Sequence, residues 1–423
     1  MRSKRILVWF RNDLRLHDNE MLVEAVAKSD GILPVYFFDP RHFGSTNLQT
    51  DKTGAGRAKF LIESVLSLRE AMIRKGGNLL VITGSPESHI CSLVEKYDIS
   101  EVYHHREVGF EETSVSANVE DALWKQKINL KHFIGHTLYN KEDLPFPIKD
   151  IPDVFSQFKK KTERDAIVKP CYEEPEHIVF VESEAWGDVP DLKALGFSEE
   201  AVPESDLPGG EHAGLQHLNT LLSSGSTIYD RPAKQPPGKQ AFFSRLSPWL
   251  ALGCLSPRKV YWTMKAADQV PGAANFNQVL LGLLWRDYYR FMFKKHGIGF
   301  FRDSEFEQFV RQDKDAEPEA LVRWKTGQTG NALVDGYMNE LNKSGYIPHA
   351  GRLVVATYLV YVLKQDWIRG AAYFEEKLVD YAPASNWGNW ASVAHKGLNV
   401  TNKAAFDLEK QIKVFDMDIA DVA

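Results

Sequence analysis

Cysteine is scarce in this chain, and long hydrophobic runs are missing. The 423 residues contain three cysteines, Cys91, Cys171 and Cys254, whose wide spacing matches no metal-binding pattern. Such scarcity is typical of a reducing compartment, so we expect a cytoplasmic protein without a disulfide framework. No segment approaches the roughly 20 apolar residues that span a bilayer. The apolar run from Ile6 to Phe10 is too short for a signal peptide, although import of a longer precursor into an organelle stays open.

An excess of positive charge is missing as well. The formal net charge is −6, so the chain as a whole has no electrostatic attraction to nucleic acid. Any binding of DNA must therefore come from a local basic face. With 43% hydrophobic and 26% charged residues, the composition is that of a globular protein, and the length favours two or three domains.

The first third of the chain alternates short apolar runs with helical patterns. We expect strands at 6–10, 31–38, 78–83, 101–105 and 129–134, and helices at 19–27, 56–74, 86–96 and 113–126. This alternation predicts a Rossmann-like α/β domain with a five-stranded parallel sheet covered on both faces. Because no Gly-x-Gly-x-x-Gly follows the first strand, a dinucleotide fingerprint is absent, but a ligand can still lie beyond the carboxyl ends of the strands.

The rest of the chain divides into a connector and a helical part. From His136 to Asp206 the sequence is rich in Pro, Glu and Lys, which is typical of a long connection with some helix. Amphipathic helical patterns then follow at 211–222, 257–267, 275–295, 332–342 and 352–363. We expect an α/β domain over residues 1–135, a connector over 136–208 and an all-α domain over 209–423.

Five strings in the helical part carry the most specific information. The last, Leu378-Val-Asp-Tyr-Ala-Pro-Ala-Ser-Asn-Trp-Gly-Asn-Trp390, combines an acid, two amides and two indoles, and alone it could be a packed helix with two aromatic anchors. The other strings lie at 247–258, 284–290, 324–330 and 366–367, and a further one, Val8-Trp-Phe-Arg-Asn-Asp-Leu-Arg-Leu-His-Asp18, lies near the N-terminus. In this order the strings resemble the photolyase/cryptochrome family, and Ser-Asn-Trp-Gly-Asn-Trp is most similar to DASH-type cryptochromes.

The resemblance implies an FAD-dependent flavoprotein that responds to blue light. It assigns FAD binding to Tyr229, Ser244, Arg245, Leu246, Ser247, Trp285, Arg286, Tyr289, His349, Arg352, Asp380 and Asn386. From the residues alone, the Ser-Pro pair would be a helix cap and Arg352 with Asp380 an ordinary ion pair between helices. In the family this pair lies beside the flavin ring, and Asn386 faces flavin N5 with an amide that cannot donate a proton as an acid would. Two departures, Phe243 and Ala382, predict weaker FAD affinity or an altered pocket.

The resemblance also implies a chain of tryptophans that passes electrons to the flavin. Trp390 and Trp367 match its first two members, and with Trp324 and Asn386 they form the candidate catalytic set. The expected stretch for the third tryptophan offers Phe306 and Phe309 instead, so Trp324 or a tyrosine is the candidate terminal donor. The alternative is that these rings are core aromatics.

The family's lesion pocket is where the match fails. The corresponding positions are Gly282, Trp285, His349, Leu353 and Ser392. Only Trp285 keeps the family's residue; loss of a hydrogen-bond acceptor or a stacking wall costs about 1–3 kcal/mol each. We therefore expect a DASH-like blue-light flavoprotein. The alternative is a deoxyribodipyrimidine photolyase, so whether the protein is an enzyme stays open. A third hypothesis is a light-independent flavin protein.

Antenna and partner predictions rest on the same resemblance. Residues 105–108 and Glu111-Glu112 resemble a string that contacts a folate (MTHF) antenna, although an acidic helix start explains them equally well. Single- or double-stranded DNA is the expected partner at the face of the FAD domain, and we expect a monomer without a metal ion. The basic side chains that could follow phosphates are Arg231, Lys234, Lys239, Arg245, Lys396 and Lys403.

Overall fold

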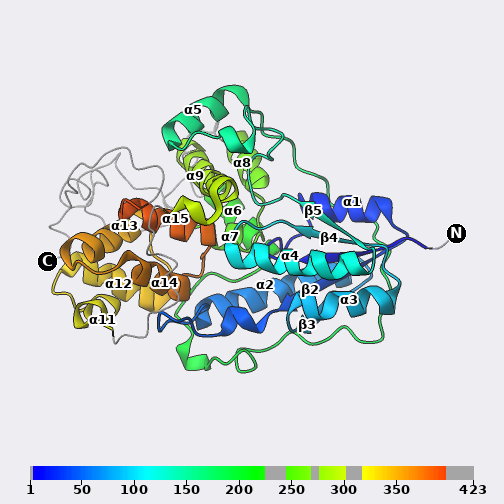
Figure 1. Ribbon diagram of the computed structural model, residues 1–423, viewed down its shortest axis with the longest axis horizontal. Coiled ribbons are helices and arrows are strands. Elements are labelled where there is room, and N and C mark those ends of the chain that lie inside the picture. Colours follow the sequence, from blue (N-terminus) through cyan, green and yellow to red (C-terminus); the bar gives the residue numbers. More distant parts are fainter. Residues whose placement is uncertain (1–2, 224–243, 268–275, 302–316, 397–423) are drawn as a thin grey trace.

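One parallel sheet organises the N-terminal part of the protein (Figure 1). The computed structural model describes residues 3–223, 244–267, 276–301 and 317–396. The strands are β1 (Arg5–Phe10), β2 (Gly31–Phe38), β3 (Leu80–Thr83), β4 (Glu101–His105) and β5 (Asn129–Phe133), in the order β3-β2-β1-β4-β5. This confirms the predicted five-stranded parallel sheet. The connections run to opposite sides of β1, which creates a crevice at the carboxyl ends of β1 and β4.

Helices cover both faces of this sheet. They are α1 (Glu20–Lys28) and α2 (Ala55–Arg74) on one face, and α3 (Pro86–Tyr97) and α4 (Phe110–Lys125) on the other. The alternation of side chains along β1 explains why both faces need cover. Ile6, Val8 and Phe10 pack toward α1 and α2, whereas Leu7 and Trp9 pack toward α3 and α4.

A helical domain follows the connector, and its later helices lie at the end of the molecule away from the N-terminus (Figure 1). The connector contains α5 (Phe155–Asp165). The helices after it are α6 (Glu211–Ser223), α7 (Ser247–Ala251), α8 (Pro257–Ala267), α9 (Phe276–His296), α11 (Glu319–Lys325), α12 (Ala332–Ser344), α13 (His349–Thr357), α14 (Trp367–Lys377) and α15 (Pro383–Val393). This confirms the predicted helical half; the boundaries at residues 135 and 208 stay a proposal.

One predicted helix differs from the observed one. The sequence pattern predicts a single helix over 352–363, but α13 begins at His349 and a π-helical turn follows at Tyr358–Val362. Pro348 precedes the first residue of α13, and a proline at this boundary has no amide hydrogen to continue a helix backward. The early start brings His349 and Arg352 onto consecutive turns of α13.

Buried polar contacts join the N-terminal string to the helical domain. Arg15 is fully buried and donates to the carbonyls of Gly253 (2.8 Å) and Gly135 (2.9 Å). Asp18 accepts from Arg258 of α8 at 2.6 Å. Removing one member of such a pair leaves a buried charge uncompensated, so these contacts define how the two domains dock.

Three features of the described ranges bear on function. No helix in them is long and apolar enough to cross a membrane. They also contain no group of three His, Cys, Asp or Glu side chains that could hold a metal ion. All three cysteines have free thiols.

Candidate functional site

A small recess lies between α13 and α15, with a volume of about 60 Å³. Its lining includes His349, Arg352, Asp380, Asn386 and Trp390, which are five of the predicted site residues. Arg352 Nη2 donates to Asp380 Oδ2 at 2.7 Å. Burial opposes the charge of Arg352, but Asp380 and the nearby Tyr346 outweigh it and raise the pKa of the guanidinium. The guanidinium is therefore held in its charged form.

One oxygen of the acid remains available to a ligand. Asp380 Oδ1 is buried and has no hydrogen-bond partner among the residues that the structure describes. Because an unsatisfied buried acceptor is costly, this atom is suited to accept from an N–H group of a bound molecule. A flavin carries such an N–H group on its pyrimidine edge, so Asp380 Oδ1 has the chemistry to accept from it.

The amide and imidazole side chains of the recess are fixed in different ways. Asn386 Nδ2 donates to the carbonyl of Ala371 at 3.0 Å, which ties α15 to α14 and leaves the amide oxygen directed elsewhere. His349 has an exposed side chain that lines the recess. Partial desolvation in the recess, and secondarily the charge of Arg352, lower the pKa of His349. His349 is therefore neutral near pH 7.

Four tryptophans of α11, α14 and α15 lie in two contact groups, and of these only Trp390 lines the recess. Trp390 lies edge-to-face with the fully buried Trp324, at a distance of 6.2 Å between ring centroids. Trp367 lies edge-to-face with Trp387 at 6.1 Å and tilted against Phe301 at 5.9 Å. The sequence prediction included Trp390, Trp367 and Trp324 but assigned no role to Trp387.

Other predicted site residues lie outside the recess. Trp285 stacks on Phe155 of the connector, with ring centroids 3.5 Å apart. The guanidinium of Arg286 donates hydrogen bonds to the backbone carbonyls of His136 and Leu250. Both contacts join segments more than 30 residues apart in sequence, so local patterns could not reveal them.

Two further predicted residues contact each other rather than the recess. The Tyr289 hydroxyl lies 3.2 Å from the hydroxyl of Ser392, which also donates to the carbonyl of Gly388 at 2.8 Å. Gly282 lies on the exposed side of α9, and a Cβ added there would meet no atom within 4 Å. Leu353 does line the recess, as predicted for the substrate pocket.

The predicted phosphate-binding segment lies next to the ion pair through Tyr346. The guanidinium of Arg245 lies 5.5 Å from the Tyr346 ring centroid, and that of Arg352 lies 5.3 Å from it. Arg245 also pairs with Asp206 at 2.7 Å. Leu246 is buried at the start of α7, whereas Ser244 and Ser247 are half-buried. Tyr229, Phe243, Phe306, Phe309, Arg231, Lys234, Lys239 and Lys403 lie outside the described residues.

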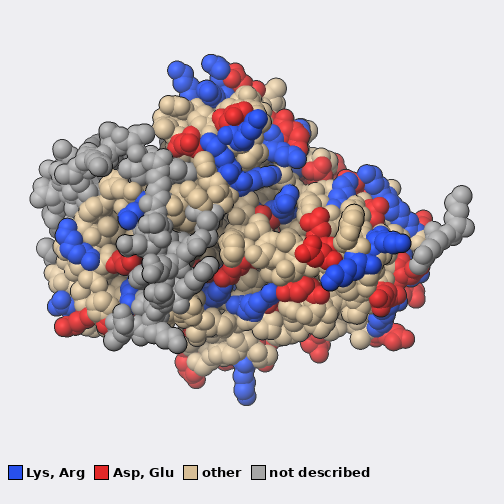
Figure 2. Space-filling model, in the orientation of Figure 1, with Lys and Arg blue, Asp and Glu red and all other residues tan. Residues whose placement is uncertain are grey.

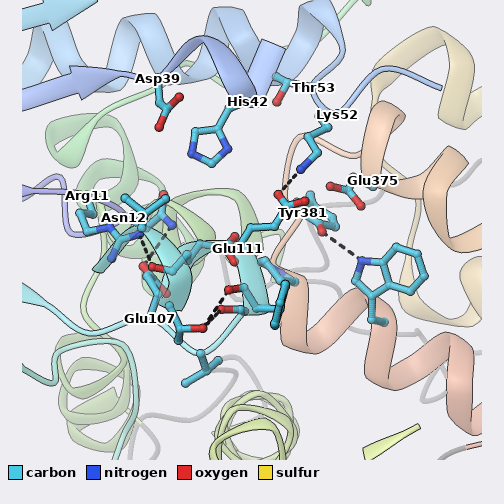
Figure 3. A pocket seen from close by; sticks show the side chains of 18 of the residues that line it. Arg11, Asn12, Asp39, His42, Lys52, Thr53, Glu107, Glu111, Glu375 and Tyr381 are labelled. Carbon is cyan, nitrogen blue, oxygen red and sulfur yellow. Dashed lines mark hydrogen bonds and ion pairs between the residues drawn. The ribbon is translucent and has the colours of Figure 1, made fainter. Parts of the chain in front are cut away.

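A second and much larger cavity lies between the two domains (Figure 3). It has a volume of about 1250 Å³ and opens at the carboxyl ends of β1, β2 and β4, facing α14 and α15. Glu111 and Glu112 of the first turn of α4 line it, and Glu111 pairs with Lys52 across the space. Burial, reinforced by Glu107, raises the pKa of Glu112. The acidic helix start therefore faces a cavity.

The floor of this cavity is a charged network that crosses the domain interface. Glu107 accepts from Asn12 at 3.1 Å and from Arg290 of α9 at 2.8 Å, and lies 3.2 Å from His136. Burial alone would raise the pKa of Glu107, but His136 and Arg290 hold it well below the ordinary value. Burial lowers the pKa of His136 to about 4.

Comparisons with known proteins cover nearly the whole chain. The family model of DNA photolyase matches residues 6–176, and that of the FAD binding domain of DNA photolyase matches residues 279–421. Cryptochrome DASH of Gloeobacter violaceus is 37% identical, over 99% of this chain and 84% of its own length. Cryptochrome DASH of Xenopus laevis is 38% identical, over 97% of this chain and 80% of its own.

Solved structures agree with this result. The crystal structure of a Synechocystis cryptochrome has a TM-score of 0.85 and 35% identity, over 98% of this chain and 87% of its own. An archaeal photolyase from Sulfolobus tokodaii, solved with two FAD molecules, has a TM-score of 0.75 and 26% identity, over 97% of this chain and 87% of its own. The chain therefore belongs to the photolyase/cryptochrome family, carries the family's FAD-binding domain and is similar to DASH cryptochromes over nearly its full length.

Proposed function

We propose that the protein is a DASH-like cryptochrome whose FAD is reduced under blue light by electrons supplied through Trp390. The observation that carries this proposal is the position of Trp390, which lines the recess beside Asn386 and contacts a second tryptophan, Trp324. When bound, FAD supplies the light-driven redox chemistry. The Arg352–Asp380 pair would orient the flavin and place a fixed positive charge beside it.

Photoreduction in matched variants tests this proposal. Trp390→Phe removes the donor indole and keeps an apolar ring, so bound FAD is expected to stay oxidised under blue light. Trp124→Phe is the control, because Trp124 is 80% exposed on α4 of the other domain. Flavin absorption during illumination reports the result. Equal photoreduction in Trp390→Phe and the wild type would contradict the role of Trp390.

Repair of pyrimidine dimers is the alternative activity, and the lesion-pocket positions argue against it. A stacking role for Trp285 would compete with its contact to Phe155, and the Ser392 hydroxyl is bonded to Gly388. Light-dependent loss of thymine dimers from a single-stranded oligonucleotide, with reduced protein and a dark control, decides between the two. Rapid repair would make the protein a photolyase.

We also infer that the large cavity between the domains holds a light-harvesting chromophore. Its volume of about 1250 Å³ suits a planar dye, and the Sulfolobus tokodaii photolyase with two FAD molecules implied a novel light-harvesting cofactor in that protein. The resemblance favours a folate (MTHF), for which Glu112 is the candidate hydrogen-bonding acid. Flavin fluorescence excited through added MTHF tests this, and Glu112→Gln is expected to reduce it.

DNA binding, a cytoplasmic location and a monomeric state complete the proposal. The ion pair with Asp206 partly neutralises Arg245, one of the side chains predicted to contact DNA phosphates. On the face seen in Figure 2, basic and acidic side chains are interspersed. Fluorescence polarisation of labelled single- and double-stranded oligonucleotides tests DNA binding.

The free thiols of the three cysteines support a reducing compartment. Cell fractionation and light scattering test the location and the monomer.

A further inference from the structure

A line of aromatic side chains leads from the recess to the cavity between the domains. Trp387 lies one turn before Trp390 on α15 and 6.1 Å from Trp367 on α14, centroid to centroid. The indole Nε1 of Trp387 donates to the hydroxyl of Tyr381 at 3.1 Å (Figure 3). Trp387 and Tyr381 both line the cavity. An aromatic contact path therefore reaches the cavity wall.

The ring of Trp390 is in contact with the same two helices. A Cβ added to Gly370 would lie 2.4 Å from Cη2 of Trp390, so this indole packs on the backbone of α14 one turn from Trp367. Electron transfer between aromatic rings falls off steeply with distance and is efficient between rings in near contact. Trp390 and the Trp367–Trp387 pair therefore lie along the same contact between α14 and α15.

Tyr381 has the surroundings that a redox-active tyrosine needs. Its hydroxyl and the carboxyl of Glu375 both lie at the wall of the cavity (Figure 3). Burial raises the pKa of that acid, and the nearby hydroxyl opposes this effect. The guanidinium of Arg57 lies 4.5 Å from the ring centroid. A cation over the ring opposes a charged tyrosyl cation but tolerates a neutral radical. Oxidation here therefore requires transfer of the phenolic proton, and Glu375 is in place to accept it.

We propose that Tyr381 is the terminal electron donor of a branch that leaves the flavin site through Trp367 and Trp387 and ends at the cavity between the domains. The inference rests on the proposed photoreduction. When bound, oxidised FAD would supply the photoexcited acceptor for one electron from these indoles. One electron then passes from Tyr381 to the oxidised Trp387, the O–H bond of Tyr381 breaks, and its proton passes to Glu375. Tyr381 is left as a neutral radical.

An alternative route for the electron, from Trp390 through Trp324 to Tyr373, lacks a suitable proton acceptor. Tyr373 lies 5.8 Å from Trp324, centroid to centroid, and its hydroxyl contacts the amide oxygen of Asn342 at 2.5 Å and the carbonyl of Lys325 at 3.1 Å. Both acceptors are neutral oxygens of very low basicity. A proton released from Tyr373 would therefore meet no carboxylate among its hydrogen-bond partners in the described residues.

The charged groups around Glu375 set the pH range of the branch. Burial, with a smaller effect of Glu111, raises the pKa of Glu375 to about 7, against the opposing influence of Arg57, Lys52 and the Tyr381 hydroxyl. Glu112 is a further acid that faces Tyr381. Above about pH 7 Glu375 is ionised and accepts the proton. Below this pH Glu375 is protonated, so the yield of tyrosyl radical should fall.

Electron paramagnetic resonance of the illuminated, FAD-loaded protein tests the branch. Protein grown with ring-deuterated tyrosine identifies a tyrosyl radical by the narrowing of its spectrum. We expect this signal in the wild type and its loss in Tyr381→Phe, Trp387→Phe and Glu375→Gln. The matched control, Tyr373→Phe, removes the same atom from the competing tyrosine and should keep the signal. Absorption of bound FAD verifies that each variant is loaded.

A dark experiment on the same FAD-loaded proteins separates this inference from the proposed function. Azide radicals made by pulse radiolysis oxidise tryptophan, and conversion of tryptophanyl to tyrosyl radical is followed by absorption. Tyr381→Phe should lose a fast conversion phase that Tyr373→Phe retains. An unchanged phase in Tyr381→Phe, or loss of the light-induced signal only in Tyr373→Phe, would overturn the proposal. Absence of flavin photoreduction in the wild type, with the Tyr381-dependent phase present, would contradict only the proposed function.

Discussion

At the scale of single residues, the recess depends on one ion pair whose members lie on different segments. Asp380 precedes α15 and is almost fully buried, and Arg352 of α13 is its charged partner at 2.7 Å. A buried carboxylate that loses its cationic partner keeps its desolvation cost and loses the compensating attraction. The pair therefore stabilises the fold of the recess, which is the proposed site of the flavin ring.

Arg352→Ala should lower both FAD retention and stability. By leaving Asp380 unpaired, the change is expected to cost about 3–5 kcal/mol of unfolding free energy. The FAD absorbance that survives gel filtration and the urea midpoint measure the two effects. Arg323→Ala removes the same type of side chain from an exposed position of α11 and should change neither. Full FAD retention in Arg352→Ala would contradict the assignment of this recess to the flavin ring.

Gly282→Glu should be well tolerated without conferring repair. No atom lies within 4 Å of the added Cβ, and replacing an exposed helical glycine favours the helix by about 0.5–1 kcal/mol. The new carboxylate would lie on the exposed side of α9, and Leu353 and Ser392 would still stand in place of the family's residues. Thermal unfolding and light-dependent dimer loss are the measurements. Repair at the rate of a working photolyase in this single variant would show that Gly282 alone prevents it.

At the scale of elements, a turn between α7 and α8 joins the two halves of the molecule. Gly253 has φ +65°, and a Cβ there would lie 1.9 Å from the backbone oxygen of Asn12. Arg15 donates to the carbonyl of the same glycine. The turn can therefore approach the segment after β1 only because residue 253 lacks a side chain.

Gly253→Ala should destabilise the protein more than an equivalent change without a close neighbour. Gly76→Ala is the matched control, because Gly76 also has positive φ, +89°, but nothing lies within 4 Å of an added Cβ. The control measures the backbone penalty, about 1–3 kcal/mol, and the excess in Gly253→Ala measures the steric contact. Chemical denaturation gives both values. Equal losses would mean that the backbone moves away from Asn12 at little cost.

At the scale of the whole molecule, the domain interface contains ionisable groups that should make stability depend on pH. The folded state holds the pKa of His136 at about 4, below its ordinary value of 6.5, because the ring is buried. The unfolded chain therefore binds a proton that the folded chain excludes between these two values. Glu107, whose pKa is also depressed, acts in the same direction at lower pH.

Stability should consequently decrease as pH falls from about 6.5 toward 4, first through His136 and then through Glu107. Denaturation midpoints measured across this range give the slope. Replacing His136 by Gln should flatten the upper part of the profile, whereas the exposed His212→Gln should leave it unchanged. A wild-type profile that is flat from pH 6.5 to pH 4 would contradict the burial of a neutral His136.

The sequence alone determined the elements and the family. All five strands were predicted within two residues of their observed ends, because hydrophobic periodicity is a local property of the chain. The Arg352–Asp380 contact also followed from the resemblance. The stacking of Trp285 on Phe155, the contact of Trp390 with Trp324 and the link from Trp387 to Tyr381 were decided only by the tertiary structure. Side-chain packing determines these contacts: the first two join helices far apart in the chain, and the third needs the observed turn before α15.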